Sequence, residues 1–273
     1  MPADGPQASA NDGDLDIRQD GPVLRLTLDR PRRRNALSRG LIRALTEQVT
    51  AVAEGGETRV IVLAGEGPVF CAGADLTEFV EAGDPERLRA DADALTALLA
   101  AMAGCPVPIV AAVHGAAFGG GFGLVCAADI AVAAVGTQFS LSEARLGLVP
   151  ATISPYVVGA LGPREAKARM LLAAPFGAED ALRIGLVQQV AAPHEMDGAV
   201  ASLVDNLLHC APGALAAIKR LVPQVAGHEP DTTRELTAGL LVGRRASEEG
   251  QEGMAAFLAK RRPKWAPEET PAP

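Results

Sequence analysis

The chain has 273 residues, 48% of them hydrophobic and 21% charged, which is typical of a soluble globular protein with a full core. This composition excludes disordered and fibrous chains. No run of about eighteen apolar residues lacks a charge or a glycine, which excludes a membrane-spanning chain. A net charge of −8 and 3% aromatic residues argue against a nucleic-acid partner, because phosphate backbones attract basic stripes. The first residues carry no basic-then-apolar signal pattern, so we expect a cytoplasmic protein with no membrane partner.

The cysteines show no spacing that is typical of a disulfide framework or a metal site. They lie in apolar stretches without a CxxC pair or nearby histidine pairs. We therefore expect reduced, buried thiols and no bound metal. The four positions are Cys71, Cys105, Cys126 and Cys210.

The N-terminal part predicts a hairpin, a helix and a buried strand. Residues 14–19 and 23–28 alternate in polarity on either side of Asp20-Gly21, which is typical of a β-hairpin. Ser38 is a plausible N-cap for a helix that runs to about residue 53. The apolar run at 59–64 predicts the next strand.

The stretch 106–150 places a strand, a triple glycine and a carboxylate close together. Residues 107–113 predict a buried strand, and Gly119-Gly120-Gly121 allows the backbone to turn into a helix without Cβ clashes. A helix that begins in these glycines would present free N–H groups to a developing negative oxygen. A second strand at 128–134 leads to Glu143, so donors and a possible base lie near each other.

A second turn of the same kind occurs earlier, at residues 68–75 (PVFCAGAD). A long helix at 86–102 leads from it into the central strand. The order strand, helix, strand, helix, strand predicts an α/β fold with a parallel sheet, helices outside and right-handed crossovers.

After residue 150 the sequence predicts mostly helices with one short strand at 186–190, and Pro212 and Pro223 divide the last part into separate helices. Because these helices lack an obvious sheet partner, we expect an oligomer. We divide the chain into a flexible tail (1–13), a core (14–200) and a C-terminal helical oligomerisation region (201–273).

Several well-known catalytic patterns are absent from the sequence. No G-x-G-x-x-G register fits the triple glycine, and GxxxxGK[ST], GxSxG and HExxH do not occur. Dinucleotide, nucleotide-triphosphate and serine-triad chemistry are therefore disfavoured.

From about residue 14 to the end, seven pieces occur in one characteristic order: RPRRRNALS, VFCAGADL, PIVAAVHGAAFGGGFGL, ADIAVA, QFSLSEARLGLVP, ALRIGLV and EGMAAFLAKRRPKW. In this order they resemble the enoyl-CoA hydratase/isomerase (crotonase) family. The resemblance implies a spiral of ββα units with a C-terminal helical trimerisation region. It also implies an acyl-CoA thioester substrate, no cofactor beyond that thioester, and a homotrimer or dimer of trimers.

The resemblance also assigns catalytic roles. Ala74, in CAGAD, and Gly120, in the triple glycine, would donate backbone N–H groups to the thioester oxygen. Glu143 matches one of the two acid/base glutamates of the hydratases. At the position of the other, this sequence has Gly123, which cannot transfer a proton. The alternative for Glu143 from the residues alone is a surface carboxylate paired with Arg145.

The loop at 147–158, GLVPATISPYVV, departs from the commoner hydratase pattern PGAGGTQR. It resembles a subgroup that hydrates branched glutaconyl-CoA thioesters, such as methylglutaconyl- or isohexenylglutaconyl-CoA. We therefore expect a hydro-lyase that adds water to a branched or carboxylated 2-enoyl-CoA with a single glutamate. The alternatives are a Δ3-Δ2 enoyl-CoA isomerase that uses the same glutamate and a non-catalytic acyl-CoA-binding homologue.

The resemblance further places the CoA groove on this chain. Lys260, in FLAKRR, matches a lysine that reaches the CoA of a neighbouring subunit, and Leu241 stands where an aromatic residue is expected. One or more arginines of the loop at 30–34 would meet a phosphate. The groove residues implied in this way are Arg30, Arg34, Ala36, Ala72, Asp75 and Leu76.

Overall fold

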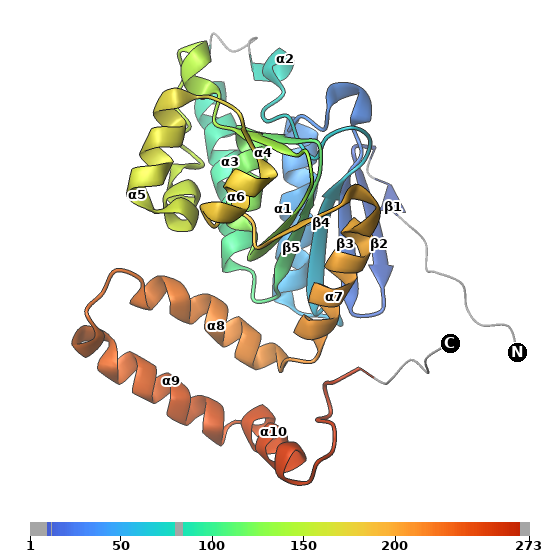
Figure 1. The fold of residues 1–273 in the computed structure, drawn as a ribbon, viewed down its shortest axis with the longest axis vertical. Coiled ribbons are helices and arrows are strands. Elements are labelled where there is room, and N and C mark those ends of the chain that lie inside the picture. The colour runs from blue at the N-terminus through green and yellow to red at the C-terminus, as the bar shows by residue number, and fades with distance from the viewer. Residues whose placement is uncertain (1–9, 12, 80–83, 268–273) are drawn as a thin grey trace, which may run out of the picture.

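The computed structural model describes residues 10–11, 13–79 and 84–267, whose strands form two sheets (Figure 1). The larger sheet has the order β1-β2-β3-β4-β5-β7-β10. Strand β2 pairs antiparallel with β1 and β3, and all pairings from β3 onward are parallel. The bounds are β1 (Ala10–Asn11), β2 (Leu15–Asp20), β3 (Val23–Leu28), β4 (Val60–Gly65), β5 (Ile109–Val113), β7 (Ile130–Ala134) and β10 (Gln189–Ala191).

The side chains of the parallel strands alternate between two hydrophobic cores. Ile61 and Leu63 of β4 face the larger core, where α1 and α3 cover the sheet, and Val60 and Val62 face a smaller core under α7. Ser38 caps α1 by accepting the Leu41 N–H at 3.1 Å, as predicted. The sheet therefore lies between two helical layers, which is the predicted α/β arrangement.

A small second sheet carries the functional turns. It consists of β6 (Ala116–Phe118), β8 (Gln138–Ser140) and β9 (Phe176–Gly177), with β6 and β8 parallel. Phe122, Phe139 and Phe176 pack together beside it, with ring centroids 5.8–6.3 Å apart. This aromatic cluster fixes α4 against the small sheet.

The α-helices cover the sheets or form the C-terminal end, and a break at Gly162 (φ 73°) divides α5. Short 3₁₀ helices lie at η1 (Pro31–Arg33), η2 (Glu143–Leu146), η3 (Pro193–Glu195) and η4 (Pro230–Thr233). The α-helices are α1 (Arg39–Glu54), α2 (Leu76–Phe79), α3 (Pro85–Gly104), α4 (Gly120–Ala127), α5 (Ser154–Leu172), α6 (Ala178–Arg183), α7 (Met196–Leu208), α8 (Pro212–Val225), α9 (Arg234–Ala246) and α10 (Glu248–Leu258).

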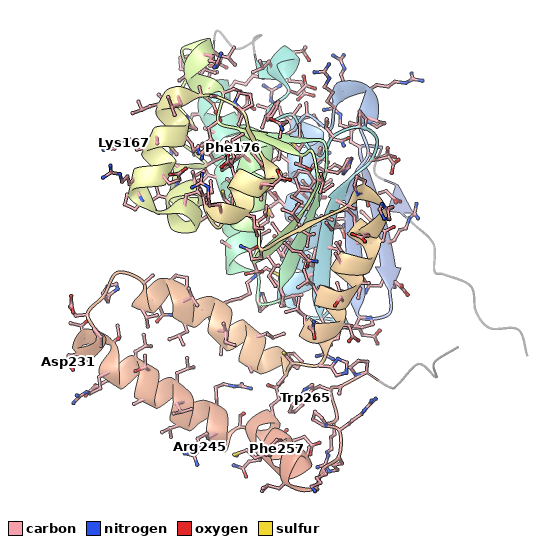
Figure 2. All side chains as sticks on the ribbon, viewed as in Figure 1. Lys167, Phe176, Asp231, Arg245, Phe257 and Trp265 are labelled. Atoms are coloured by element: carbon pink, nitrogen blue, oxygen red, sulfur yellow. The ribbon has the colours of Figure 1, made fainter. Side chains whose placement is uncertain are left out.

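Residues 212–267 form a C-terminal arm that extends away from the sheets (Figure 1). Helix α8 leaves the core at an angle to α7, and α9 and α10 continue beyond it. Figure 2 shows Arg245, Phe257 and Trp265 on this arm, apart from Phe176 in the core. The arm thus has few contacts with the rest of its own chain.

Some predicted boundaries differ in the structure. The division after residue 200 falls inside α7, which packs on the sheet through Val200, Val204 and Leu208, so the core extends to the end of that helix. Pro223 does not end a helix, because it lies within the last turn of α8. Most of the predicted tail lies outside the described residues, but Ala10–Asn11 pair with β2 as β1.

The cysteines are free thiols. The prediction that all four are buried is wrong for one of them. Cys71 and Cys105 are buried and Cys126 is half-buried, whereas Cys210 is exposed where α7 gives way to the arm. Among the described residues, no single helix is long and apolar enough to span a membrane, and one pair bent by 101° passes that test only when its helices are joined.

An ion pair holds the arm to the core. Lys219 of α8 donates to Asp129 Oδ2 at 2.6 Å and to Val107 O at 3.1 Å, and its side chain is only 9% exposed. Asp129 also accepts the Ile109 N–H at 2.7 Å. Burial raises the pKa of Asp129, and the Lys219 ammonium opposes that shift. The pair fixes where the arm begins.

We expect Lys219→Met to lower the free energy of unfolding by about 3 kcal/mol, because it leaves a buried carboxylate without its cation. Adding Asp129→Asn should recover part of this loss, since the amide oxygen still accepts from Ile109. Chemical denaturation measures both changes. Arg89→Ala, which breaks an exposed pair with Asp93, is the control and should change little. If Lys219→Met and Arg89→Ala lowered the free energy of unfolding equally, the role of the buried pair would be contradicted.

Candidate active site

Two glycine turns meet at one end of α4. Gly73 (φ 99°) and Gly119 (φ 49°) adopt backbone conformations that other residues rarely take. A Cβ on Gly73 would lie 2.9 Å from Phe118 O and 3.5 Å from Gly120 N. A Cβ on Gly120 would lie 3.8 Å from Ala74 N. The backbone nitrogens of Ala74 and Gly120 are therefore neighbours.

The N–H groups of these two residues have no acceptor among the described residues. Leu37 pairs with the first turn by donating to Gly73 O at 2.8 Å and accepting from Asp75 N at 3.0 Å, which leaves the Ala74 N–H unused. Gly120 is the first residue of α4, where helix N–H groups lack an internal acceptor. The two neighbouring N–H groups are therefore available to one acceptor oxygen, and their role as its donors stays a prediction.

Glu143 lies against the second turn. Its Oε1 is 3.2 Å from the position that a Cβ on Gly119 would take, and its buried Oε2 has no partner among the described residues. Burial raises the pKa of this carboxyl, because the charged form loses hydration. Arg145 does not neutralise it, since its Nε donates instead to Ala173 O at 2.8 Å. The alternative of a surface ion pair is therefore wrong.

This arrangement suits chemistry at a carbonyl compound. Paired N–H donors stabilise negative charge that develops on a carbonyl oxygen, and removing one such donor typically costs about 10²–10³-fold in rate. A carboxylate with a raised pKa beside them is able to take a proton and return it. Such an arrangement is chemically able to support proton exchange next to a carbonyl group through an enolate.

The structure brings most of the predicted CoA residues to the rim of the first turn. Ala72 donates its N–H to Arg34 O at 3.0 Å, and the Arg34 side chain is exposed. Leu76 follows the turn and is 45% exposed. Ala36 lies next to Leu37, which pairs with Ala74. These residues share one edge, where a thioester's pantetheine arm would have backbone groups to contact.

Arg30 has a different position from the one expected of a phosphate ligand. Its side chain points inward and contacts Asp14 Oδ2 at 2.9 Å, Asp75 Oδ2 at 3.1 Å and Ala36 O at 2.5 Å. The Thr77 hydrogen bonds, helped by Arg30, hold the pKa of Asp75 below its usual range. Arg30 and Asp75 therefore brace the turn that carries the Ala74 N–H. The Asp75-x-Thr77 spacing is a local signal for the turn, whereas no local pattern in the sequence indicates the Arg30–Asp75 pair.

Lys260 is not brought to the site by its own chain. It follows α10 on the C-terminal arm, at the opposite end of the molecule from α2 (Figure 1). A contact between Lys260 and CoA would therefore involve another subunit. Leu241, also on the arm, is 61% exposed.

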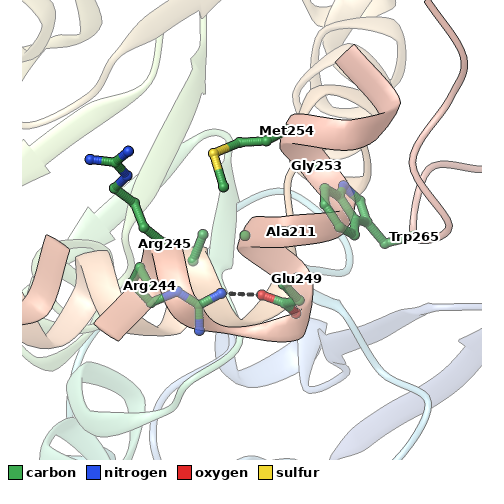
Figure 3. A pocket seen from close by; sticks show the side chains of 9 residues that line it. Ala211, Arg244, Arg245, Glu249, Gly253, Met254 and Trp265 are labelled. Carbon is green, nitrogen blue, oxygen red and sulfur yellow. Dashed lines mark hydrogen bonds and ion pairs between the residues drawn. The ribbon is translucent and has the colours of Figure 1, made fainter. Parts of the chain in front are cut away.

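A cavity of about 340 Å³ lies on the arm and not at Glu143 (Figure 3). Arg244, which forms an ion pair with Glu249, lines it together with Met254 and Trp265. Among the described residues, no group of three or more His, Cys, Asp and Glu side chains is arranged to hold a metal ion.

Comparison with known proteins assigns the family. The family model described as "Enoyl-CoA hydratase/isomerase" matches residues 18–268. The chain belongs to the enoyl-CoA hydratase/isomerase family. This confirms the resemblance in the sequence and makes the chain an enzyme of that family, with a CoA thioester as its kind of substrate.

Similar proteins match this chain over most of their length. The carnitinyl-CoA dehydratase of Salmonella arizonae is 34% identical over 92% of this chain and 97% of its own. The enoyl-CoA hydratase ACTT6 of Alternaria alternata is 33% identical over 89% and 80%. The crystal structure of an enoyl-CoA hydratase from Shewanella pealeana has a TM-score of 0.88 at 36% identity, covering 92% and 96%. The crotonase fold predicted from the sequence is therefore confirmed.

The burial of Glu143 predicts how its stability cost depends on pH. Because the folded protein holds the proton more tightly than the unfolded chain, wild-type stability falls as pH rises from about 4.3, the unfolded value, through the raised folded pKa. Glu143→Gln lacks this titration. At pH 7 we expect its Tm to exceed that of the wild type, and the difference should vanish below about pH 4. Thermal unfolding across pH measures this, and a lower Tm of the variant at pH 7 would contradict it.

Proposed function

We propose that the enzyme is a hydro-lyase that adds water to a branched or carboxylated 2-enoyl-CoA with a single glutamate. The observation that carries the proposal is the half-buried Glu143 carboxyl, whose buried Oε2 has no partner among the described residues and which lies against the turn that presents the Gly120 N–H. It extends the family assignment to one reaction and one kind of acyl group.

Each step uses groups that lie close together. The N–H groups of Ala74 and Gly120 bind the thioester oxygen. The Glu143 carboxylate takes a proton from water as the water oxygen bonds to C3. The C2–C3 π electrons then form an enolate whose negative charge rests on the thioester oxygen. The protonated Glu143 then gives the same proton to C2, which restores the thioester and the free carboxylate.

The names of the relatives and the sequence of the loop favour hydration. Relatives that cover most of this chain are named as an enoyl-CoA hydratase and a carnitinyl-CoA dehydratase, and both names describe addition or removal of water. The loop at 147–158 resembles that of the subgroup acting on branched glutaconyl-CoA thioesters, and that subgroup also tends to lack the first glutamate. These likenesses support the proposal that the chain acts as members of that subgroup do.

A second candidate is a Δ3-Δ2 enoyl-CoA isomerase. It is favoured by Gly123, because moving a proton between C4 and C2 needs only one carboxylate and the two N–H donors. A non-catalytic acyl-CoA-binding role is disfavoured, since the buried Glu143 carboxylate would then carry a desolvation cost with no use.

The test is incubation with crotonyl-CoA and 3-methylglutaconyl-CoA in deuterated water, following loss of the conjugated thioester absorbance and the product mass. We expect hydrated product from the branched acid, and Glu143→Gln should lower its rate about 10²–10⁴-fold. Glu47→Gln, an exposed carboxylate on α1, is the control and should retain the rate. Deuterium exchange or double-bond migration without hydration would support the isomerase. No change in any thioester, with stabilisation by CoA, would support a binding protein.

We also propose a homotrimer or dimer of trimers, working in the cytoplasm without a bound cofactor. The C-terminal arm exposes Val242 (66%), Phe257 (82%) and Leu258 (81%), an apolar surface that a second copy would cover. Replacing both Phe257 and Leu258 by Asp should dissociate the assembly, which sedimentation equilibrium measures. A monomeric wild type would contradict the proposal. Lys260→Ala should weaken CoA binding by the assembled protein, because Lys260 would contact the CoA of a neighbouring subunit.

A further inference from the structure

Gly123 and Ile153 are packed too tightly for any side chain at position 123. A Cβ on Gly123 would lie 2.5 Å from Ile153 Cγ2 and 3.0 Å from Ile153 Cβ, well inside contact distance. Leu99 Cδ1 would be the next atom, at 3.8 Å. Ile153 is only 2% exposed and stands at the N-cap of α5, so its side chain fills this space permanently.

The space lies close to the reactive groups. Gly123 donates its N–H to Gly119 O at 3.0 Å, so the two residues are one helical turn apart, about 6 Å along α4. Gly119 is the residue that Glu143 contacts, and Gly120 supplies one of the two donors. A side chain at position 123 would therefore enter the site from the same helix that carries the donor.

The obstacle at Gly123 differs from that at Gly121. A Cβ on Gly121 would lie 2.6 Å from the backbone oxygen of Cys71, which no substitution removes. At Gly123 the close atoms all belong to side chains. Shortening Ile153 therefore opens room at Gly123 but not at Gly121.

We propose that Ile153 is a specificity-determining residue: it occupies the volume that a second acid/base side chain at position 123 would need, and so restricts the site to one proton carrier. The inference deepens the proposed function and rests on it for the meaning of the proton carrier. It joins two departures in the sequence, Gly123 and the loop at 147–158, into one matched pair, because that loop delivers Ile153 to the space beside Gly123.

The pair has a chemical consequence. With hydrocarbon beside Gly123, the proton that Glu143 removes is the one that it returns, so both new bonds form on the face of the substrate that Glu143 occupies. A dry wall of Ile153 and Leu99 also keeps water from acting as a second acid. Acceptors whose hydration needs a separate proton donor are therefore poor substrates of this site.

The packing is tested by thermal unfolding of the full-length protein. Gly123→Ala should lower Tm by roughly 2–10 °C, because it overpacks the site. Ile153→Ala creates a cavity and should also lower Tm. The Gly123→Ala/Ile153→Ala double variant should be more stable than the sum of the two single effects predicts. Gly121→Ala is the matched control, and Ile153→Ala should not rescue it. Additive effects at Gly123, or an unchanged Tm of Gly123→Ala, would overturn the inference.

The proton-carrier role is tested with crotonyl-CoA. The Gly123→Glu/Ile153→Ala variant should hydrate it at least about 10-fold faster than Ile153→Ala, because the new carboxylate supplies a second proton carrier. Equal rates would overturn this role of Ile153. Different results contradict the two proposals. A wild type that turns over no enoyl-CoA would contradict the proposed function. Additive Tm changes at Gly123 and Ile153 would contradict the packing inference, and that measurement needs no turnover.

Discussion

The contact between two backbone turns is the constraint on which the site depends. Gly73 and Gly119 are both held at positive φ, and their neighbours Ala74 and Gly120 then point free N–H groups toward the same place. A side chain on either glycine would strike backbone or the Glu143 carboxylate, so the spacing of the donors is set by the absence of Cβ atoms. The two sheets support this arrangement, since the first turn follows β4 of the large sheet, the second follows β6 of the small sheet, and each turn enters a helix.

The surrounding polar groups are divided between support and chemistry. Arg30 forms ion pairs with Asp14 and Asp75, which fixes the first turn, and Glu143 forms no ion pair with a described residue. Arg145 is likewise occupied at Ala173 O. The result is a carboxylate with one oxygen buried and unpaired, which costs stability and raises its pKa toward the range where it exchanges protons readily.

The fold and the donor turns were predictable from the sequence because they depend on local patterns. The hairpin at Asp20-Gly21, the Ser38 cap and the glycine-rich start of α4 were confirmed, since each is set by residues adjacent in the chain. Arg30 contacts Asp75, 45 positions away in the sequence (75 − 30), and Ile153 contacts Gly123, 30 positions away (153 − 123). No sequence periodicity indicates contacts of this kind. The Pro223 boundary failed because a proline in the last turn of a helix need not end it.

The C-terminal arm is the part of the chain for which the proposed assembly matters most. Its helices bury little against their own core, and Lys219 with Asp129 is the described ion pair that joins α8 to it. In the proposed assembly, hydrophobic burial between copies would cover the exposed Phe257 and Leu258 and so stabilise the arm. If copies assemble through the arm, the rim beside Ala74 and a neighbour's Lys260 become parts of one CoA groove. The core then supplies the chemistry, while the assembly supplies a cation that Arg30, already paired within the fold, is not free to provide.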